Sequence, residues 1–277
     1  MHTSDLIESI IDLALAEDGE DITSNAIFEP GDEMRAAFTV KAAGVIAGLD
    51  IARLVFIRIN PLVQCAFHIR DGDRIEPGDV IGFVAGPATD VLKGERVALN
   101  FLQRMSGIAT RTAEYVDRIR GTKAKILDTR KTAPGQRVLD KYAVRAGGGM
   151  NHRMGLWDMA LIKDNHIDRE GVLSSAVRKV RQRCPGVTVE VEARTLDDVR
   201  ELLALGVDRI MLDNFSLEDL RRAVELVGGR IPLEASGGVT LDTIRDVALT
   251  GVDYISVGDI THSVKALDIS LDFKGSV

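Results

Sequence analysis

The second half of the chain alternates between short apolar runs and longer amphipathic stretches. The apolar runs have the length and residue content of buried strands, and there are six of them: 124–128, 159–163, 187–193, 208–213, 231–236 and 252–257. Helical spacing of apolar positions follows most of these runs, and the last four begin 21, 23 and 21 residues apart. This rhythm is typical of βα units that form a parallel sheet.

The number of units leaves two architectures open. A closed βα barrel has eight strands, so six units favour either an incomplete, open barrel or a flat doubly wound sheet. No Gly-x-Gly-x-x-Gly motif follows the first strand, which weakens the dinucleotide-binding form of the flat sheet.

The first hundred residues follow a different pattern. Apolar positions at helical spacing predict a helix over 5–16 and a short one over 49–55. The runs 38–42 and 80–84 are strand-like, and turn signals stand between them at 71–73 and 76–79. This part therefore predicts a small α+β domain, and a helical pattern over 91–120 joins it to the second half.

Composition indicates a globular protein of acidic character. Of its 277 residues, 45% are hydrophobic and 28% are charged, which argues against disorder, and the net charge of −7 gives no broad attraction to nucleic acid or anionic lipid. No apolar window has the length of a transmembrane helix, and the acidic first twenty residues lack the features of a secretory signal. The two cysteines, Cys65 and Cys184, exclude a disulfide scaffold and a cysteine-rich zinc site. We therefore expect a cytoplasmic protein that binds neither nucleic acid nor membrane.

Polar residues and glycines follow all six predicted strands. In chain order these strand ends carry 128–131 (Asp-Thr-Arg-Lys), 163–166 (Lys-Asp-Asn-His), Glu192, 213–214 (Asp-Asn), 236–238 (Ser-Gly-Gly) and 258–259 (Gly-Asp). The carboxyl ends of parallel strands meet at one rim, where βα barrels hold their ligands. Polar loops occur in any protein, but six together favour a site at this rim.

A cationic segment lies inside the acidic chain. Residues 130–166 contain seven Lys or Arg and three Asp or Glu, for a local charge of +4. This indicates a small polyanionic ligand, because guanidinium forks match carboxylate and phosphate oxygens. Arg137, Lys141 and Arg145 stand at helical spacing and are interpreted as a solvated helix face. The better candidates are Arg130, Lys131, Arg153 and Lys163, together with His152, which follows a run of glycines.

Two carboxylates and two glycine loops complete the predicted rim. Glu192 and Asp213 end consecutive strands, where neighbouring carboxylates can hold Mg²⁺ beside substrate phosphates. Glu190 shares a strand face with Glu192 and either supports the site or pairs with a rim arginine. The loops after the fifth and sixth strands, 236–240 and 258–262, open helices and are typical of a phosphate cradle.

These segments resemble quinolinate phosphoribosyltransferase, a family also known as carboxylating nicotinate-nucleotide pyrophosphorylase. The resemblance is carried by 95–110, 128–132, 141–153, 161–166, 212–215 and 234–238, and 128–166 is its most specific block. It implies an α/β fold with a small N-terminal α/β sandwich domain and an open (incomplete) βα barrel of about seven strands. We therefore place the sandwich domain at 1–104 and the barrel at 105–266, and expect 267–277 to pack back on the first domain.

The resemblance also implies an activity, a cofactor and an assembly. The reaction is transfer of phosphoribosyl from phosphoribosyl pyrophosphate to quinolinate with decarboxylation, which gives nicotinate mononucleotide, pyrophosphate and CO₂ in de novo NAD biosynthesis. Mg²⁺ is the implied cofactor, with Glu192 and Asp213 as its ligands, either directly or through substrate or water. The implied assembly is a homodimer, or a larger oligomer, in which Arg104 reaches into the neighbouring subunit's site.

Carried over residue by residue, the resemblance gives each candidate a role. Arg130, His152, Arg153 and Lys163 resemble the group around the carboxylates of quinolinate. Lys131 resembles the lysine that holds phosphoribosyl pyrophosphate. The expected catalytic residues are Lys131, Lys163, Glu192 and Asp213. The remaining expected substrate contacts are Thr129, Ser236, Gly237, Gly238, Val257, Gly258 and His262.

One position departs from the family pattern, and three alternatives stay open. Asp259 stands where a small or apolar residue is expected, and its charge would weaken phosphate binding unless the side chain points outward. The first alternative is a related transferase with another acceptor base, as in the molybdenum-transport-associated relatives, which Lys-Asp-Asn-His at 163–166 disfavours. The second is a Schiff-base aldolase that uses Lys163, and the third is a non-enzymatic anion-binding protein.

Overall fold

The computed structural model of the protein describes residues 3–273, which form two compact units. Within these residues the first unit comprises 3–113, 132–148 and 263–273, and the second comprises 114–131 and 149–262. The chain therefore leaves the second unit after its first strand, contributes a segment to the first unit, and then returns.

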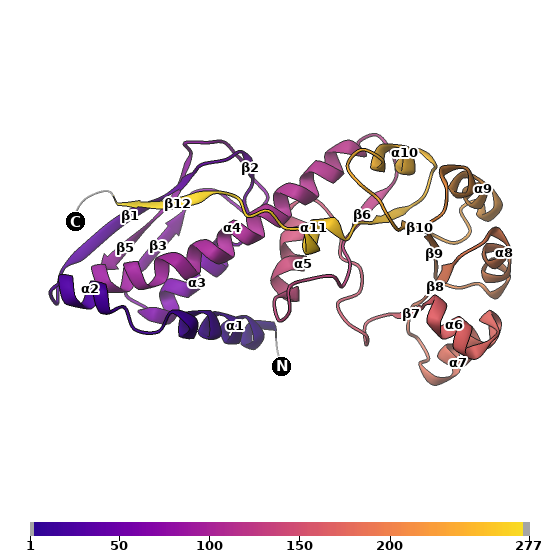
Figure 1. Ribbon diagram of the computed structural model, residues 1–277, viewed down its shortest axis with the longest axis horizontal. Coiled ribbons are helices and arrows are strands. Elements are labelled where there is room, and N and C mark those ends of the chain that lie inside the picture. Colours follow the sequence, from indigo (N-terminus) through magenta and orange to yellow (C-terminus); the bar gives the residue numbers. More distant parts are fainter. Residues whose placement is uncertain (1–2, 274–277) are drawn as a thin grey trace. The chain divides into compact units, whose positions relative to one another are not determined.

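A four-stranded antiparallel sheet is the centre of the first unit (Figure 1). Its strands, in spatial order, are β12 (Ile269–Phe273), β1 (Glu33–Val40), β5 (Val80–Pro87) and β3 (Gln64–Phe67). Strand β12 pairs with β1 in a register that runs from Val40 opposite Ile269 to Ala36 opposite Phe273. A separate two-stranded sheet is formed by β2 (Gly44–Val45) and β4 (Arg74–Ile75).

Helices pack on this sheet through aromatic and glycine contacts. The helices of the first unit are α1 (Thr3–Asp18), α2 (Ile22–Ile27), α3 (Leu49–Ile59), α5 (Arg137–Ala146) and most of α4 (Ala88–Arg118). Phe38 of β1 meets Phe56 of α3, with 6.4 Å between ring centroids. A Cβ atom on Gly94 of α4 would lie 2.6 Å from the Phe56 ring, so glycine allows α4 to approach α3 closely. Asp71, in a predicted turn, accepts hydrogen bonds from the main-chain N–H groups of Gly48 and Leu49 at the start of α3.

The second unit is built on a six-stranded parallel sheet. Its strands, in spatial order, are β6 (Lys125–Leu127), β11 (Tyr254–Ser256), β10 (Leu233–Ser236), β9 (Arg209–Asp213), β8 (Val189–Ala193) and β7 (Ala160–Ile162). The six strands predicted from the apolar runs are confirmed. Strands β6 and β7 stand at the two ends of the sheet, so the barrel is open. A one-residue parallel bridge between Leu127 and Met150 is all that the described residues show of the expected seventh strand.

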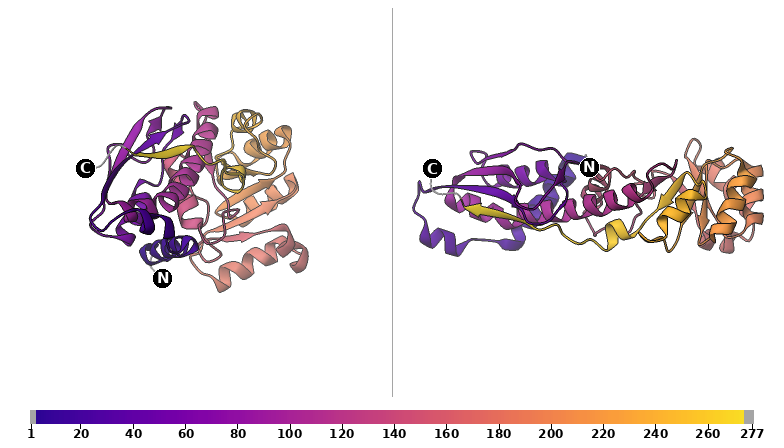
Figure 2. Two further views of the ribbon diagram at one scale, coloured as in Figure 1. Left: turned by 60° about the vertical axis from the view of Figure 1, so that its left-hand side comes forward. Right: turned by 90° about the horizontal axis from the view of Figure 1, so that it is seen from above.

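Helices alternate with these strands along the chain. They are α6 (Asp164–Glu170), α7 (Leu173–Arg183), α8 (Leu196–Leu205), α9 (Leu217–Val227), α10 (Ile244–Leu249) and α11 (Asp259–His262). Helices α7, α8 and α9 cover one face of the sheet, as both sets of views show (Figures 1 and 2). The hydroxyls of Thr195 and Ser216 accept main-chain hydrogen bonds at the starts of α8 and α9, which fixes where each helix begins.

The compact units divide the chain differently from the predicted boundaries. The division falls after Ala113 rather than at 104, because α4 continues without a break, and 132–148 belong to the first unit rather than to the barrel. Gly147 explains part of this placement, since a Cβ atom there would collide with the Ala109 carbonyl of α4. The interpretation of Lys141 as part of a solvated helix face is wrong, because its side chain is almost fully buried in α5.

By length and apolar character, the helices of the described residues are not suited to crossing a membrane. Helix α4 is the longest, at 31 residues, yet no helix within residues 3–273 combines the length and the apolar character needed to cross a bilayer.

Candidate active site

The predicted rim residues of the second unit follow neighbouring parallel strands. Lys163 comes directly after β7, Glu192 lies near the end of β8, and Asp213 is the last residue of β9. The parallel pairing places all these strand ends at one edge of the sheet. The other rim residues are Thr129, Arg130 and Lys131 after β6, Ser236, Gly237 and Gly238 at the end of β10, and Val257 and Gly258 after β11.

Two cationic side chains of the rim, Arg130 and Arg153, interact through their charges. Burial lowers the pKa of Arg153, and the nearby charge of Arg130 lowers it further, while Glu190 and Asp158 oppose the shift. The Arg153 guanidinium donates from Nη1 to the carbonyl oxygen of Met159 at 3.1 Å. The charges of Arg130 and Arg153 therefore lie close enough to repel each other, and a dianionic ligand between them would relieve this repulsion.

Lys163 and two carboxylates form the next part of the same rim. Burial raises the pKa of Glu192, and the charge of Asp213 raises it further, while Lys163 opposes the shift. Within the described part of the chain, Oε2 of Glu192 is buried without a hydrogen-bond partner. Glu192 and Asp213 repel each other, and Oε2 of Glu192 is available as a ligand atom, so this pair suits a cationic ligand. The Lys163 main-chain N–H donates to Nδ1 of His166 at 2.9 Å, which fixes the start of α6 rather than contributing a rim ligand.

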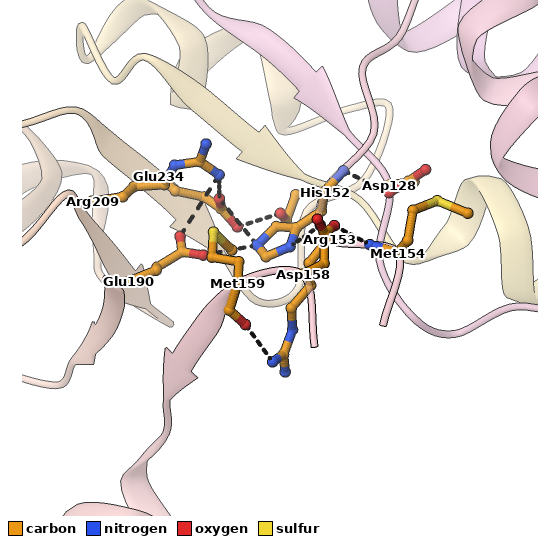
Figure 3. Close-up of polar contacts among 10 residues, drawn as sticks. Asp128, His152, Arg153, Met154, Asp158, Met159, Glu190, Arg209 and Glu234 are labelled. Carbon is orange, nitrogen blue, oxygen red and sulfur yellow. Dashed lines mark hydrogen bonds and ion pairs between the residues drawn. The ribbon is translucent and has the colours of Figure 1, made fainter. Parts of the chain in front are cut away.

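His152 is held by its neighbours on all sides. Its main-chain N–H donates to Oδ1 of Asp128 at 2.8 Å, and Asp128 is fully buried at the end of β6. Its Nδ1 atom accepts a hydrogen bond from the Arg153 main-chain N–H at 2.8 Å. Its Nε2 atom lies 3.0 Å from Oε2 of Glu190 and 3.5 Å from Oε2 of Glu234 (Figure 3).

Several members of this cluster were missed from the sequence. Nη1 of Arg209 donates to Oε2 of Glu234 at 3.1 Å and lies 3.9 Å from Oε1 of Glu190. The Ser256 hydroxyl donates to Oε1 of Glu234. Period-two alternation is the signal that could have found them, because Glu234 lies two residues before the rim residue Ser236, as Glu190 does before Glu192.

The loop after β10 is tied to the end of β9. Gly237 has φ +100°, and a Cβ atom there would collide with the side-chain oxygen of Asn214. Asn214 itself has φ 54°, donates from its main chain to the Ser236 carbonyl at 2.8 Å, and donates from Nδ2 to Oδ2 of Asp213 at 2.8 Å. Glycine at 237 therefore lets the loop pass close to the residue that holds Asp213.

The loop after β11 meets the segment after β6. The Val257 main-chain N–H donates to the Leu127 carbonyl at 2.9 Å, which aligns the two strand ends. A Cβ atom on Gly258 would lie 3.0 Å from the His262 ring and 3.2 Å from Cδ of Lys131. The structure thus brings Gly258, His262 and Lys131 together. The Thr129 hydroxyl accepts the Lys131 main-chain N–H at 3.0 Å and shapes that turn.

Asp259, which departs from the family pattern, takes part in a hydrogen bond. The hydroxyl of Tyr115, a buried residue of α4, donates to Oδ2 of Asp259 at 3.0 Å. The carboxylate is therefore engaged with a phenol of its own unit, which offsets part of the repulsion that a free charge beside a phosphate would cause.

Arg104 lies in the first unit, on α4. Its guanidinium forms a two-pronged ion pair with Asp140 of α5, with Nε and Nη2 at 3.0 and 2.9 Å from the two carboxylate oxygens. Asp140 is fully buried and also accepts the main-chain N–H of Ala133. The pair anchors the 132–148 segment to α4.

Taken together, fold and rim define a class of protein. An open parallel α/β barrel that gathers guanidinium, ammonium, carboxylate and glycine-loop groups at its carboxyl edge is an enzyme scaffold for phosphorylated, polyanionic small molecules.

Comparison with known proteins gives the family. The model of the quinolinate phosphoribosyl transferase N-terminal domain matches residues 21–106, and that of the C-terminal domain matches residues 108–272. The chain belongs to the quinolinate phosphoribosyltransferase family, which confirms the resemblance seen in the sequence.

Relatives and solved structures agree along the whole chain. A mitochondrial quinolinate phosphoribosyltransferase (decarboxylating) of Nicotiana tabacum is 44% identical, over 98% of this chain and 83% of the relative. A probable nicotinate-nucleotide pyrophosphorylase (carboxylating) of Bacillus subtilis is 47% identical, over 91% of this chain and 87% of the relative. The crystal structure of NadC from Streptococcus pyogenes is 41% identical with a TM-score of 0.95, over 100% of this chain and 98% of that one. The expected fold class is confirmed.

Proposed function

We propose a role for each rim residue in the reaction of the family. The enzyme transfers phosphoribosyl from phosphoribosyl pyrophosphate to quinolinate with decarboxylation, giving nicotinate mononucleotide, pyrophosphate and CO₂ in de novo NAD biosynthesis. The observation that carries the assignment of roles is the electrostatic linkage of Arg130 with Arg153 and of Lys163 with Glu192 and Asp213 at one rim.

Quinolinate is bound at the arginine end of the rim. Its two carboxylates meet Arg130 and Arg153, whose planar guanidinium groups offer paired donors to carboxylate oxygens. His152 contacts Arg153 through its ring and adds a third group at this end. Lys163, whose charge acts on the neighbouring Glu192, adds positive charge for a carboxylate of the same substrate.

Phosphoribosyl pyrophosphate is bound at the glycine-loop end. The main-chain groups of Ser236, Gly237 and Gly238 cradle one phosphate, with Gly258 and His262 beside it. Lys131, which approaches Gly258 closely, supplies the positive charge. Thr129 and Val257 complete the contacts, since the first shapes the Lys131 turn and the second aligns the strand ends.

The carboxylates Glu192 and Asp213 fit a magnesium ion. The buried Oε2 of Glu192, without a hydrogen-bond partner among the described residues, and the neighbouring Asp213 charge make a donor set of the hard oxygen type. Bound there, directly or through substrate or water, Mg²⁺ would supply charge neutralisation for the pyrophosphate leaving group.

The reaction then needs no side-chain nucleophile. The bond between the ribose C1 and the pyrophosphate oxygen breaks with its electron pair on oxygen, and Lys131 stabilises the charge that develops. Glu192 and Asp213 stabilise the positive charge on the ribose ring. The pyridine nitrogen, held in line by the clamped carboxylates, donates its lone pair to C1. The ring becomes cationic, so the 2-carboxylate leaves as CO₂ with its electron pair on C2, which takes up a proton.

The test is a product assay with matched omissions. Purified protein is incubated with quinolinate, phosphoribosyl pyrophosphate and Mg²⁺, and CO₂ and nicotinate mononucleotide are measured. We expect stoichiometric amounts of both, and none when either substrate is omitted. Absence of the mononucleotide, or its formation from nicotinate without release of CO₂, would overturn the assignment. Borohydride inactivation in the presence of a carbonyl substrate would instead favour an aldolase in which Lys163 forms a Schiff base.

We further propose that the enzyme is a cytoplasmic homodimer. Arg104 supports the dimer, because the pairing with Asp140 uses two of its N–H groups and leaves the rest of the fork for a substrate held by a second copy. The free thiols of Cys65 and Cys184 support a reducing compartment. Size-exclusion chromatography with light scattering tests the assembly, and a monomeric active enzyme would refute it.

A further inference from the structure

The interior of the barrel holds a polar cluster just below the rim. Glu190 of β8 and Glu234 of β10 are both fully buried, and the side chains meet across β9. Strands two positions apart in a sheet are separated by about 10 Å, so the carboxyl groups can meet only because the sheet curves around them. A curved wall that brings together two buried acids, a histidine and an arginine is not needed for packing, since apolar residues would fill the same space at lower cost.

Ion pairs hold the cluster together, and both carboxyl oxygens of Glu190 are buried without a hydrogen-bond partner among the described residues. Burial raises the pKa of both carboxyl groups, and the nearby charge of Glu190 raises that of Glu234 further. Arg209 supplies positive charge to both carboxyl groups, since its Nη1 lies 3.1 Å from Oε2 of Glu234 and 3.9 Å from Oε1 of Glu190. The Ser256 hydroxyl donates to the second oxygen of Glu234.

The ring of His152 connects this cluster to the rim. Its Nδ1 atom accepts the Arg153 main-chain N–H, so the ring proton lies on Nε2, 3.0 Å from Oε2 of Glu190. Figure 3 shows the ring between Glu190 and Glu234 on one side and the Arg153 main chain on the other. A rotation of the ring would therefore break contacts on both sides at once.

We propose that Glu190 and Glu234, bridged by Arg209, are positioning residues that hold His152, and through its ring the main chain of Arg153, in the orientation that meets the carboxylates of quinolinate. This inference rests on the proposed function of the rim. It predicts that the cluster acts on quinolinate binding and leaves phosphoribosyl pyrophosphate binding nearly unchanged.

The same atoms could also be read as a metal site. One ligand atom from each of His152, Glu190 and Glu234 lies within 4.8 Å of the others. The Arg209 guanidinium, however, already provides the balancing positive charge at hydrogen-bonding distance from Glu234, and a divalent cation beside it would be repelled. The geometry therefore favours a histidine support over a metal centre.

Two substitutions of Glu190 separate positioning from charge. Glu190→Gln keeps the shape and removes the charge, whereas Glu190→Asp keeps the charge and withdraws the carboxylate by one methylene. If the cluster positions His152, both variants raise KM for quinolinate by about tenfold or more, as expected for loss of the 3.0 Å contact between a buried carboxylate and the imidazole. KM for phosphoribosyl pyrophosphate changes by less than about twofold. If Glu190 only reduces the positive charge of the rim, Glu190→Gln lowers KM for quinolinate and Glu190→Asp leaves it unchanged. This result would overturn the proposal.

A readout without substrate keeps this test independent of the reaction. The ¹⁵N spectrum of the imidazoles, assigned with His152→Asn, is expected to show one protonated and one unprotonated nitrogen for His152 in the unaltered protein. Both Glu190 variants are expected to lose this single tautomer. Failure of the proposed function would appear as an unaltered protein that makes no mononucleotide, while failure of this inference would appear as a His152 spectrum that the variants do not change.

Two controls complete the design. Glu225→Gln, an exposed carboxyl on α9, is expected to leave both KM values and the His152 spectrum unchanged. Thermal unfolding shows whether each Glu190 variant is folded, and if glutamine is not tolerated the aspartate variant decides by itself.

Elemental analysis tests the alternative of a metal centre. One equivalent of a metal ion in the unaltered protein, lost in Glu190→Gln, would overturn the proposal in favour of a metal centre.

Discussion

Replacing Glu234 with glutamine is expected to change how the stability of the protein depends on pH. Burial and, to a smaller extent, the charge of Glu190 raise the pKa of Glu234, while His152 and Ser256 oppose the shift, and the net result is a pKa of about 7. Arg209 also faces the group, as its ion-pair partner. The ordinary pKa of a glutamate is 4.5, so the unfolded chain releases this proton at much lower pH than the folded protein.

The sign of the effect follows from the proton count. Between pH 4.5 and about 7 the folded protein binds more protons at Glu234 than the unfolded chain, so the free energy of unfolding falls as the pH rises. At about 1.4 kcal/mol per pH unit, the whole fall is about 3 kcal/mol, of which about 1 kcal/mol lies between pH 6 and pH 7. Above the folded-state pKa the contribution is constant. Glutamine has no proton to lose, so Glu234→Gln lacks this fall.

The assay compares urea unfolding of the two proteins over a pH series. Measurements above the isoelectric point of about 5.4 keep the protein charged in solution. The difference in free energy of unfolding is expected to shift in favour of Glu234→Gln by about 1.4 kcal/mol from pH 6 to pH 8, because the groups that do not contact Glu234 titrate alike in both proteins. Glu225→Gln serves as the exposed control with a constant difference. Parallel curves for the unaltered protein and Glu234→Gln would refute the reasoning.

Three further predictions concern activity. Arg153→Ala and Lys163→Ala are each expected to reduce quinolinate turnover by about 100-fold or more with the fold intact by circular dichroism, because each removes a charge that binds or stabilises substrate; near-normal rates in either variant would contradict the rim assignment. Arg104→Ala is expected to be inactive, and mixing it with Lys163→Ala should restore about a quarter of the wild-type rate through sites shared in a dimer; no recovery would argue against a shared site. Gly237→Ala is expected to raise KM for phosphoribosyl pyrophosphate by about tenfold, since a Cβ atom collides with Asn214, and an unchanged KM would show that this loop does not cradle the phosphate.

The strand pattern of the second unit was predictable because its strands are buried on both faces. Buried parallel strands read as continuous apolar runs, and strand β8 shows this well, since all five of its residues are buried. The rim residues could be predicted from the same apolar runs, because the polar residues and glycines at the end of each run lie at the carboxyl end of a strand. The seventh strand could not be found, because a bridge through Met150 alone leaves no apolar period in the sequence.

The placement of 132–148 in the first unit, and the polar cluster of His152, Glu190, Arg209 and Glu234, were harder to predict for a different reason. Amphipathic spacing places Lys141 on a polar stripe, but it does not show that tertiary contacts bury that stripe. Arg209 and Glu234 look like ordinary polar interruptions of a strand. Their partners are separated in sequence by 25 residues or lie on another element, so local periodicity contains no information about the pairing. Contacts of this kind appear only once the register of the sheet is known.

The pairing of β12 with β1 has a consequence for the order in which the protein can be assembled in the cell. Val40 of β1 pairs with Ile269 of β12. The ribosome must therefore add more than two hundred residues after Val40 before the edge strand β12 can join the antiparallel sheet. During that time β1 exposes unpaired main-chain groups and is open to wrong partners. We expect nascent chains stalled before Ile269 to depend on chaperones, and a circular permutant that begins at this strand to mature faster.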